Sequence, residues 1–286
     1  MTGPPRAETS RSTILSGTES RWSFVSGRCP RGRSLPIGTW AEPAPRLTPR
    51  VPQDEPVTVD LPPVALLASP LLGPAVWRPA AAKLADHGWD VRVVPGLAQA
   101  PGSPEAVLEH LRNVLPVESP LALVAHSNAG LYLPTAAAER RVVASVFVDA
   151  ALPAAAGATP LAPPAMHDFL RQLAGVDGLL PPWTQWWVEE QLAALFPDAA
   201  SRTAVMAERH RLPLTYFTAT IDAPAGWTAR PAAYLGFDDT YQEERERAER
   251  WGWRVETLPG GHLHQLVDPA GVATALDQLL RQQLQW

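Results

Sequence analysis

Short apolar runs, each bounded by glycine, proline or polar residues, recur along the chain from about residue 60 onward. Runs of this length are typical of buried strands, and the segments between them have the length and the ends of helices. Strands alternating with helices predict βαβ units and a parallel sheet covered on both faces. The predicted strands are residues 64–68, 91–94, 121–125, 142–148, 232–237 and 253–258, and the predicted helices are residues 77–87, 103–115, 240–251 and 270–284, with one more directly after Ser127.

The alternation is interrupted between residues 152 and 212. This stretch is rich in Ala, Leu and Pro and has no clear strand pattern, so we interpret it as a helical cap inserted over the sheet. Residues 214–219 follow it as a further apolar run, and whether this run joins the sheet stays open at this point. The expected architecture is an α/β fold in which a mostly parallel central sheet is flanked by helices and covered by an inserted cap.

Residues 1–56 have a different composition. Ser, Thr, Gly, Pro and Arg dominate, and the first 50 residues hold eight Arg against three Glu. Such a segment buries too little apolar surface to offset its ordering entropy. We expect either a disordered extension or translated upstream sequence ahead of a start at Val57; the functional alternative is a basic arm. The globular domain is then residues 57–286.

Composition and charge narrow the class of protein. The chain has 286 residues, of which 46% are hydrophobic, which is enough for a sizeable core. A net charge of -5 gives no general attraction to nucleic acid or to an anionic membrane. No apolar run approaches the ~18 residues of a membrane span, and the N-terminus lacks the apolar segment of a secretory signal. We therefore expect a cytoplasmic protein without nucleic-acid or membrane partners.

Single residue types add two further expectations. Cys29 is the only cysteine, which excludes an intramolecular disulfide and a cysteine-based zinc site. Lys83 is the only lysine among 24 basic residues, and 32 residues are proline, a bias that indicates a GC-rich, bacterial coding sequence. No phosphate-binding glycine loop or cofactor motif is found, so the sequence predicts no cofactor and no metal. The oligomeric state stays open.

The strongest chemical feature is the apolar run at residues 121–125, which is followed at once by His126, Ser127 and Asn128. A serine at a sharp strand-to-helix turn has a strained backbone and needs small residues two positions away on each side. Ala125 and Ala129 meet that demand. A serine hydroxyl is a weak nucleophile, so it needs an adjacent base and a third group that orients the base.

Residues 121–130 resemble the nucleophile elbow of the α/β-hydrolase family, with Ala125 and Ala129 where glycine is usual. The loop that begins Gly260-Gly-His262-Leu-His264 is similar to the end of the small esterase and hydroxynitrile-lyase branch of that family. The resemblance covers about residues 60–286. It implies that Ser127 is the nucleophile and His262 the base, while His264 is expected to point elsewhere.

The resemblance also implies an acid between the serine and the histidine in the chain. The segment after the last strand but one contains Asp238 and Asp239, of which we favour Asp239 because Asp238 lies closer to the strand. Asp149, at the end of the strand after the elbow, is the main alternative.

An oxyanion hole needs backbone N–H donors. The resemblance implies Asn128 as one donor and Leu71, in the loop after the first strand, as the other. Ser69 and Pro70 stand there in place of the usual His-Gly, and Ser69 is a candidate substrate contact. Three tryptophans of the predicted cap are candidates for an apolar pocket over the serine: Trp183, Trp186 and Trp187.

These residues favour a serine hydrolase that acts on a small or medium apolar ester or thioester. A lyase or tailoring enzyme with the same three residues, or a non-enzymatic small-molecule-binding member of the fold, remains an alternative, because one fold supports many chemistries.

Overall fold

A six-stranded parallel sheet forms the centre of the structure, a computed structural model that describes residues 61–208 and 210–285. The predicted extension, residues 1–56, lies outside the described residues. Neighbouring strands follow the order β2-β1-β3-β4-β7-β8, and every pairing is parallel. The predicted α/β class with a parallel sheet is therefore confirmed. The strands are β1 (Val64–Leu67), β2 (Val91–Val93), β3 (Leu121–Ser127), β4 (Val142–Ala150), β7 (Ala233–Gly236) and β8 (Arg254–Thr257).

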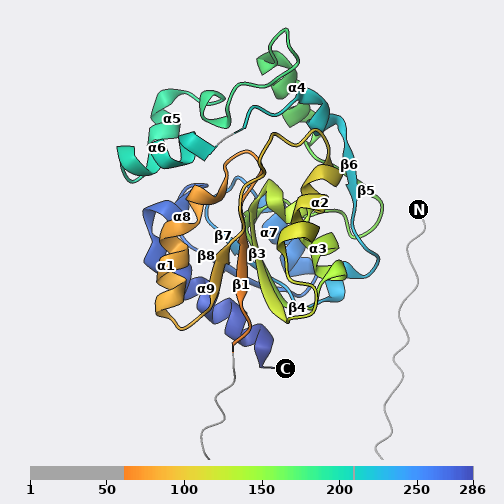
Figure 1. Cartoon of the computed structure of the whole chain (residues 1–286), viewed down its shortest axis with the longest axis vertical. Coiled ribbons are helices and arrows are strands. Elements are labelled where there is room, and N and C mark those ends of the chain that lie inside the picture. The colour runs from red at the N-terminus through yellow and green to blue at the C-terminus, as the bar shows by residue number, and fades with distance from the viewer. Residues whose placement is uncertain (1–60, 209, 286) are drawn as a thin grey trace, which may run out of the picture. The chain divides into compact units, whose positions relative to one another are not determined.

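Helices cover both faces of this sheet. On one face α1 packs against α9, and on the other α2 packs against α3 (Figure 1). Pro104 opens α2 directly after Ser103, as the sequence predicts, and the Asp268 side chain caps α9 by accepting the Gly271 N–H at 2.9 Å. The helix expected directly after Ser127 begins later, at Leu133, after a 3-10 turn, and α8 was not predicted. The bounds are α1 (Arg78–Asp86), α2 (Pro104–Val114), α3 (Leu133–Glu139), α7 (Gln242–Arg250), α8 (His264–Val267) and α9 (Pro269–Leu284).

The hydrophobic core lies on both faces of the central strands β3 and β4. Every residue of β3 is buried, as expected of a strand between two helical layers. Trp77, just ahead of α1, is fully buried, and its indole N–H donates to the carbonyl of Leu67 at 3.0 Å. This bond ties the loop after β1 to the end of its own strand, so the segment beside the elbow is held rigidly.

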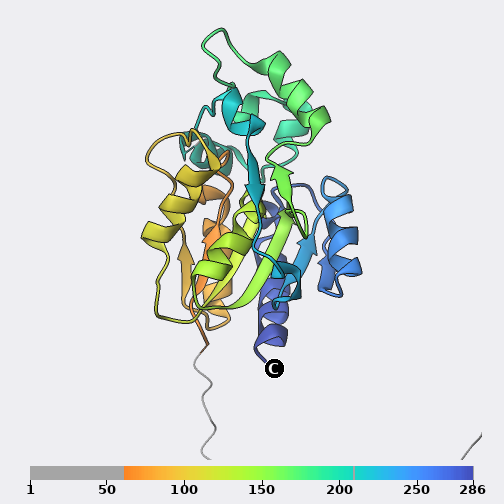
Figure 2. The same cartoon turned by 90° about the vertical axis from the view of Figure 1, so that its right-hand side faces the viewer.

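Most of the segment between β4 and β7 lies over the carboxyl end of the sheet, and its last part returns along the side of the sheet to the start of β7 (Figures 1 and 2). It is mainly helical, as expected, but it also contains a short strand, β5, that pairs antiparallel with β6. Residues 214–218 form a 3-10 helix after Pro213 and lie outside the central sheet. The elements of this cap are β5 (Ala158–Pro160), α4 (Pro164–Leu173), η3 (Trp183–Gln185), α5 (Glu189–Ala193), α6 (Ala199–Glu208), η4 (Leu214–Thr218) and β6 (Thr220–Asp222). The returning part of the chain contains η5 (Trp227–Ala229), which packs against Trp253 ahead of β8.

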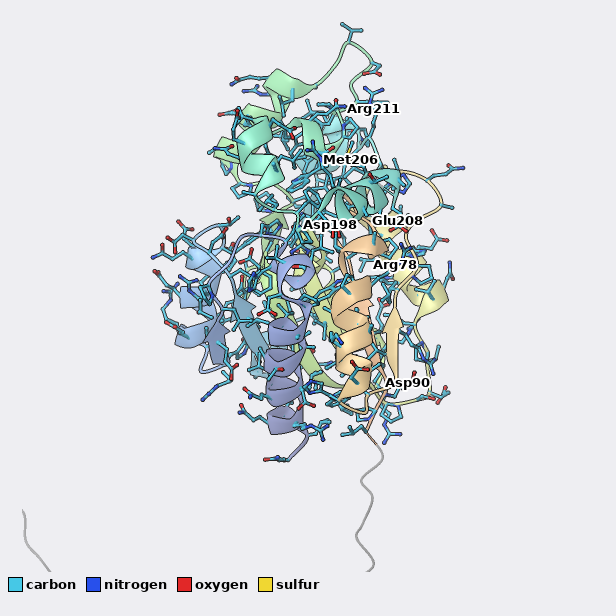
Figure 3. All side chains as sticks on the ribbon, turned by 90° about the vertical axis from the view of Figure 1, so that its left-hand side faces the viewer. Arg78, Asp90, Asp198, Met206, Glu208 and Arg211 are labelled. Atoms are coloured by element: carbon cyan, nitrogen blue, oxygen red, sulfur yellow. The ribbon has the colours of Figure 1, made fainter. Side chains whose placement is uncertain are left out.

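One carboxylate fastens the cap to the body. Glu208, the last residue of α6, lies beside Arg78 at the start of α1 (Figure 3) and forms an ion pair with it. The same carboxylate accepts the backbone N–H of Ala75 at 2.6 Å. Both partners belong to the segment that follows the β1 loop, so the cap is anchored close to that loop. Within residues 61–208 and 210–285, no helix is long and apolar enough to cross a membrane.

Candidate active site

Ser127 stands at the turn that the sequence predicts. It ends β3 with φ 59° and ψ -134°, a strained conformation for a residue with a side chain, and η2 (Asn128–Leu131) follows directly. The chain also approaches itself closely at Gly130, where an added Cβ would come within 2.2 Å of the Ala151 carbonyl oxygen. The sequence pattern drew attention to Ala125 and Ala129, and the structure adds Gly130 as a position where a side chain would collide with the end of β4.

His262 faces the serine. It lies in the loop between β8 and α8, and its Nε2 is 3.0 Å from Ser127 Oγ. Gly260 allows the loop to fold back on itself, because a Cβ there would come within 2.1 Å of the His264 ring. His264 packs edge-on against Phe237 and has no contact with the serine, in line with the expectation that it points elsewhere.

Asp149, and not Asp239, meets the imidazole. His262 Nδ1 is 2.6 Å from Asp149 Oδ2, and the Phe237 N–H donates to Oδ1 at 3.3 Å. Asp149 is fully buried and has φ 41°, a second strained residue beside the strained serine. The structure thus brings Ser127, His262 and Asp149 into one hydrogen-bonded line.

The position of Asp239 corrects the preferred assignment of the acid. Its side chain is 89% exposed and pairs with Arg245 at 3.5 Å, away from the imidazole. Asp238 accepts the Thr240 N–H at 2.7 Å within the turn. Asp238 has its partner within its own turn, and Asp239 is in water beside Arg245 of α7, so neither is held toward His262.

Tyr234 of β7 secures the end of β4. Its hydroxyl donates to the Ala150 carbonyl at 2.8 Å and accepts the Ala150 N–H at 2.9 Å. Burial, together with the nearby negative charge of Asp149, holds the pKa of Tyr234 well above its usual range. The hydroxyl therefore stays protonated and satisfies both polar groups of a backbone segment that the β4 ladder leaves irregular near Ser127.

His126 contacts both the backbone and the ring of His262, which the sequence analysis did not predict. Its Nε2 is 2.8 Å from the His262 carbonyl oxygen, so Nε2 carries the proton and donates it. The two rings stack with centroids 4.6 Å apart. Burial lowers the pKa of His126 well below its usual value, and the adjacent His262 lowers it further. A neutral imidazole thus fixes the backbone and the ring of His262.

Tyr241 is the second residue that the sequence analysis missed. Its Oη is 3.4 Å from Ser127 Oγ, and its ring centroid is 5.6 Å from that of His262. The segment expected to supply a carboxylate therefore supplies a phenol instead. Tyr241 is the residue directly before α7, and no sequence motif marks a tyrosine at that position as part of a site.

In the loop after β1, the predicted oxyanion donor, the Leu71 N–H, already has a hydrogen-bond partner. The Leu71 N–H donates to Ser69 Oγ at 3.3 Å, and Ser69 is almost fully buried. Pro70 between them has no N–H. On the other side of the nucleophile, Asn128 Oδ1 accepts the Tyr216 hydroxyl at 2.9 Å, which links the residue after the serine to the cap.

The three tryptophans do not share one environment. Trp183 lies with its ring centroid 6.4 Å from His262, and Trp187 packs against Trp183 while remaining 36% exposed. Trp186 instead packs on Phe217, and its indole N–H donates to the Pro181 carbonyl. Trp183 and Trp187 therefore form an aromatic wall on the histidine side, whereas Trp186 belongs to the cap interior.

A hollow of about 510 Å³, partly open to solvent, lies on the β1 side of the elbow. Neither Ser127 nor His262 lines it, although Ala129 does, so it borders the nucleophile without containing it. Its lining is mainly apolar and includes Leu67, Ser69, Pro70, Val94, Leu111, Ala129 and Tyr132. In the described part of the chain, no three His, Cys, Asp or Glu side chains are grouped so that they could hold a metal ion.

Comparison with known proteins gives matches by structure only. No protein-family model and no curated protein sequence matches the chain. An extracellular α/β-hydrolase from a Paenibacillus species is similar with a TM-score of 0.59 and 15% identity, over 76% of this chain and 98% of that one. Polyneuridine aldehyde esterase is similar with a TM-score of 0.59 and 16% identity, over 77% and 99%.

The Arabidopsis methylesterase MES16 is similar with a TM-score of 0.56 and 13% identity, over 77% of this chain and 99% of that one. Each similarity extends over almost the whole of the compared enzyme, so it includes the cap as well as the sheet. The likeness at this level of identity concerns the fold. With the sheet order, the strained serine after β3 and the histidine after β8, it shows that this chain has the α/β-hydrolase fold.

Proposed function

We propose that this protein is a serine hydrolase that cleaves a small or medium apolar carboxylic ester, or thioester, through an acyl-serine intermediate. One observation carries the proposal: the His262 imidazole bridges the Ser127 hydroxyl at 3.0 Å and the Asp149 carboxylate at 2.6 Å. These three groups are the parts that serine-based acyl transfer requires.

In the acylation step, His262 Nε2 takes the proton from Ser127 as Oγ attacks the carbonyl carbon of the substrate. The C–O bond to the leaving group then breaks, and the electron pair leaves with the alkoxy oxygen. The same imidazole returns its proton to that oxygen. Ser127 is left as an acyl ester, and the alcohol departs.

In deacylation, water takes the place of the alcohol and His262 again moves the proton. Asp149 accepts the Nδ1–H throughout, which keeps Nε2 free to act as the base and stabilises the imidazolium that forms. Its burial beside a single imidazole makes this interaction strong, because little water screens it.

Charge on the substrate oxygen needs N–H donors. The Asn128 N–H is the first, as the residue after the nucleophile. The Leu71 N–H is the second in our proposal: its 3.3 Å bond to Ser69 is long, and a charged oxyanion is a much better acceptor than a neutral hydroxyl. Before substrate binds, the Ser69 hydroxyl accepts the hydrogen bond of the Leu71 N–H, and the oxyanion then replaces it.

The surroundings favour an apolar substrate. Trp183 and Trp187 supply an aromatic wall near His262, and a mainly apolar hollow borders the elbow on its other side. Such surfaces gain free energy by burying hydrocarbon.

The proposal is tested with a fluorophosphonate probe and a panel of p-nitrophenyl esters of increasing acyl length. We expect the wild type to be labelled and to hydrolyse the esters, and Ser127→Ala to lose both properties. Ser119→Ala, in the exposed loop before β3, is the matched control and should behave as the wild type. Absence of labelling in the wild type contradicts the proposal, and labelling without any ester turnover indicates the lyase or tailoring alternative.

A further inference from the structure

The phenol of Tyr241 lies next to the candidate nucleophile, yet no step of the proposed reaction uses it. Its Oη lies 3.4 Å from Ser127 Oγ. Its ring centroid is 5.6 Å from that of His262, whose Nε2 also contacts this oxygen, so the phenol and the imidazole are neighbours at the serine. A hydroxyl placed next to both the nucleophile and the base is within reach of an oxygen bonded to the attacked carbon.

The protonation state of this hydroxyl is fixed by its surroundings. Burial raises the pKa of Tyr241 above its usual value, and the nearby charge of Asp149 raises it further. The phenol therefore keeps its proton over the range in which an imidazole acts as a base. Tyr241 can donate a hydrogen bond but does not itself supply a proton.

The sheet order decides which substrate oxygen the phenol meets. The loop that holds Leu71 follows β1, on one side of β3, whereas Tyr241 follows β7, on the other side beyond β4. The oxyanion belongs with the backbone donors. The leaving-group oxygen must face His262 to receive its proton, and Tyr241 lies on that side.

We propose that Tyr241 is a further catalytic residue, whose hydroxyl donates a hydrogen bond to the alkoxy oxygen of the leaving group. The inference rests on the proposed ester hydrolysis. As the C–O bond breaks, the electron pair collects on the alkoxy oxygen, which takes its proton from His262 Nε2. The Tyr241 hydroxyl keeps its own proton and stabilises the developing charge by a hydrogen bond.

This role defines the substrate more narrowly. Departure of an aliphatic alcohol places much negative charge on its oxygen and depends strongly on such a donor. Departure of an acidic phenol such as p-nitrophenol depends on it little, because the ring delocalises the charge. Tyr241 therefore points to esters of aliphatic alcohols.

The test compares Tyr241→Phe with the wild type on an ethyl ester and a p-nitrophenyl ester of the same acid. Phenylalanine keeps the ring beside His262 and removes only the hydroxyl. We expect kcat/KM for the ethyl ester to fall by about 10–100-fold through kcat, and kcat/KM for the p-nitrophenyl ester to stay within about threefold. Asp239→Asn, in the same loop with an exposed side chain, is the control and should leave both unchanged.

Other outcomes overturn the inference. An equal loss on both esters means that Tyr241 only positions Ser127 or His262, and no loss on either means that it has no catalytic role. A wild type that hydrolyses p-nitrophenyl esters but no alkyl ester also overturns it, while the proposed hydrolase function stands. If fluorophosphonate does not label the wild type at Ser127, the proposed function fails and this inference fails with it.

Discussion

The carboxyl ends of β4 and β7 lie side by side, and both carry aspartates, yet only one of them faces the candidate base. At the end of β4, Asp149 is fully buried, and its two oxygens meet the Phe237 N–H and His262 Nδ1. At the end of β7, Asp239 is in water with Arg245, and the inward-facing group is the phenol of Tyr241.

Strand register explains the difference. Val148 pairs with Leu235, and the next residues along the two strands are Asp149 and Gly236. Asp149 is thus level with the last residue of β7, whereas Asp238 and Asp239 lie in the turn beyond it. A buried carboxylate needs hydrogen-bond donors around it. At the position of Asp149 the Phe237 N–H and His262 Nδ1 are these donors. Asp238 instead accepts a hydrogen bond within its own turn, and Asp239 pairs with Arg245 of α7.

The difference between Asp149 and Asp239 is tested most directly by replacing each carboxylate with an amide. We expect Asp149→Asn to lower kcat by about 10³–10⁴-fold, because an amide can hold His262 in the wrong tautomer and no longer stabilises the imidazolium. Asp239→Asn should keep kcat within about twofold of the wild type, since its carboxylate is exposed and bound only to Arg245. Steady-state kinetics on one ester, with far-UV circular dichroism to confirm folding, measures both. The reverse order of effects would return the role to the β7 loop.

A smaller effect is expected where the two strand ends are joined. Tyr234→Phe removes both hydrogen bonds to Ala150 and leaves a buried N–H and C=O without partners, so the free energy of unfolding should fall by about 1–3 kcal/mol. Urea denaturation measures this, and an unchanged midpoint would show that the hydroxyl does not hold the end of β4.

The same variant has a pH signature. Because the pKa of Tyr234 is raised in the folded state, its contribution to stability is fully present below the unfolded tyrosine pKa of about 10. Above that pH the unfolded chain loses this proton while the folded chain keeps it, so the free energy of unfolding falls as pH rises. In Tyr234→Phe the free energy of unfolding should therefore decline less steeply above about pH 10, because one titrating proton is missing.

Much of the fold could be predicted from the sequence because its determinants are local. The apolar runs placed all six strands of the central sheet, and the position of Ser127 follows from the small residues of its turn. His262 is similarly marked by the two glycines before it. A strained turn and a folded-back loop each limit the residue types within a few positions, and such limits can be read along the chain.

The candidate acid and the residues that contact His262 could not be predicted, since they depend on contacts between distant segments. Asp149 and Asp239 both follow strands, and only the register of β4 against β7 separates them. His126 and Tyr241 carry no local pattern: their roles follow from the packing of His262 against them. The pairing of β5 with β6 across the cap likewise joins segments about 60 residues apart, which periodicity does not reveal.

The smallest expected effect is at Asp238, and it tests how firmly the β7 turn holds Tyr241. Asp238→Ala removes the hydrogen bond to the Thr240 N–H, an exposed interaction for which we expect a loss of about 0.5–1 kcal/mol in unfolding free energy. The turn keeps a second support, because Arg245 donates to the Asp238 backbone carbonyl at 3.1 Å, a contact the substitution leaves intact. The ratio of ethyl-ester to p-nitrophenyl-ester kcat/KM should therefore stay within about threefold of the wild type. A drop in that ratio as large as the one expected for Tyr241→Phe would mean that the Asp238 side chain, rather than Arg245, places the phenol beside the serine.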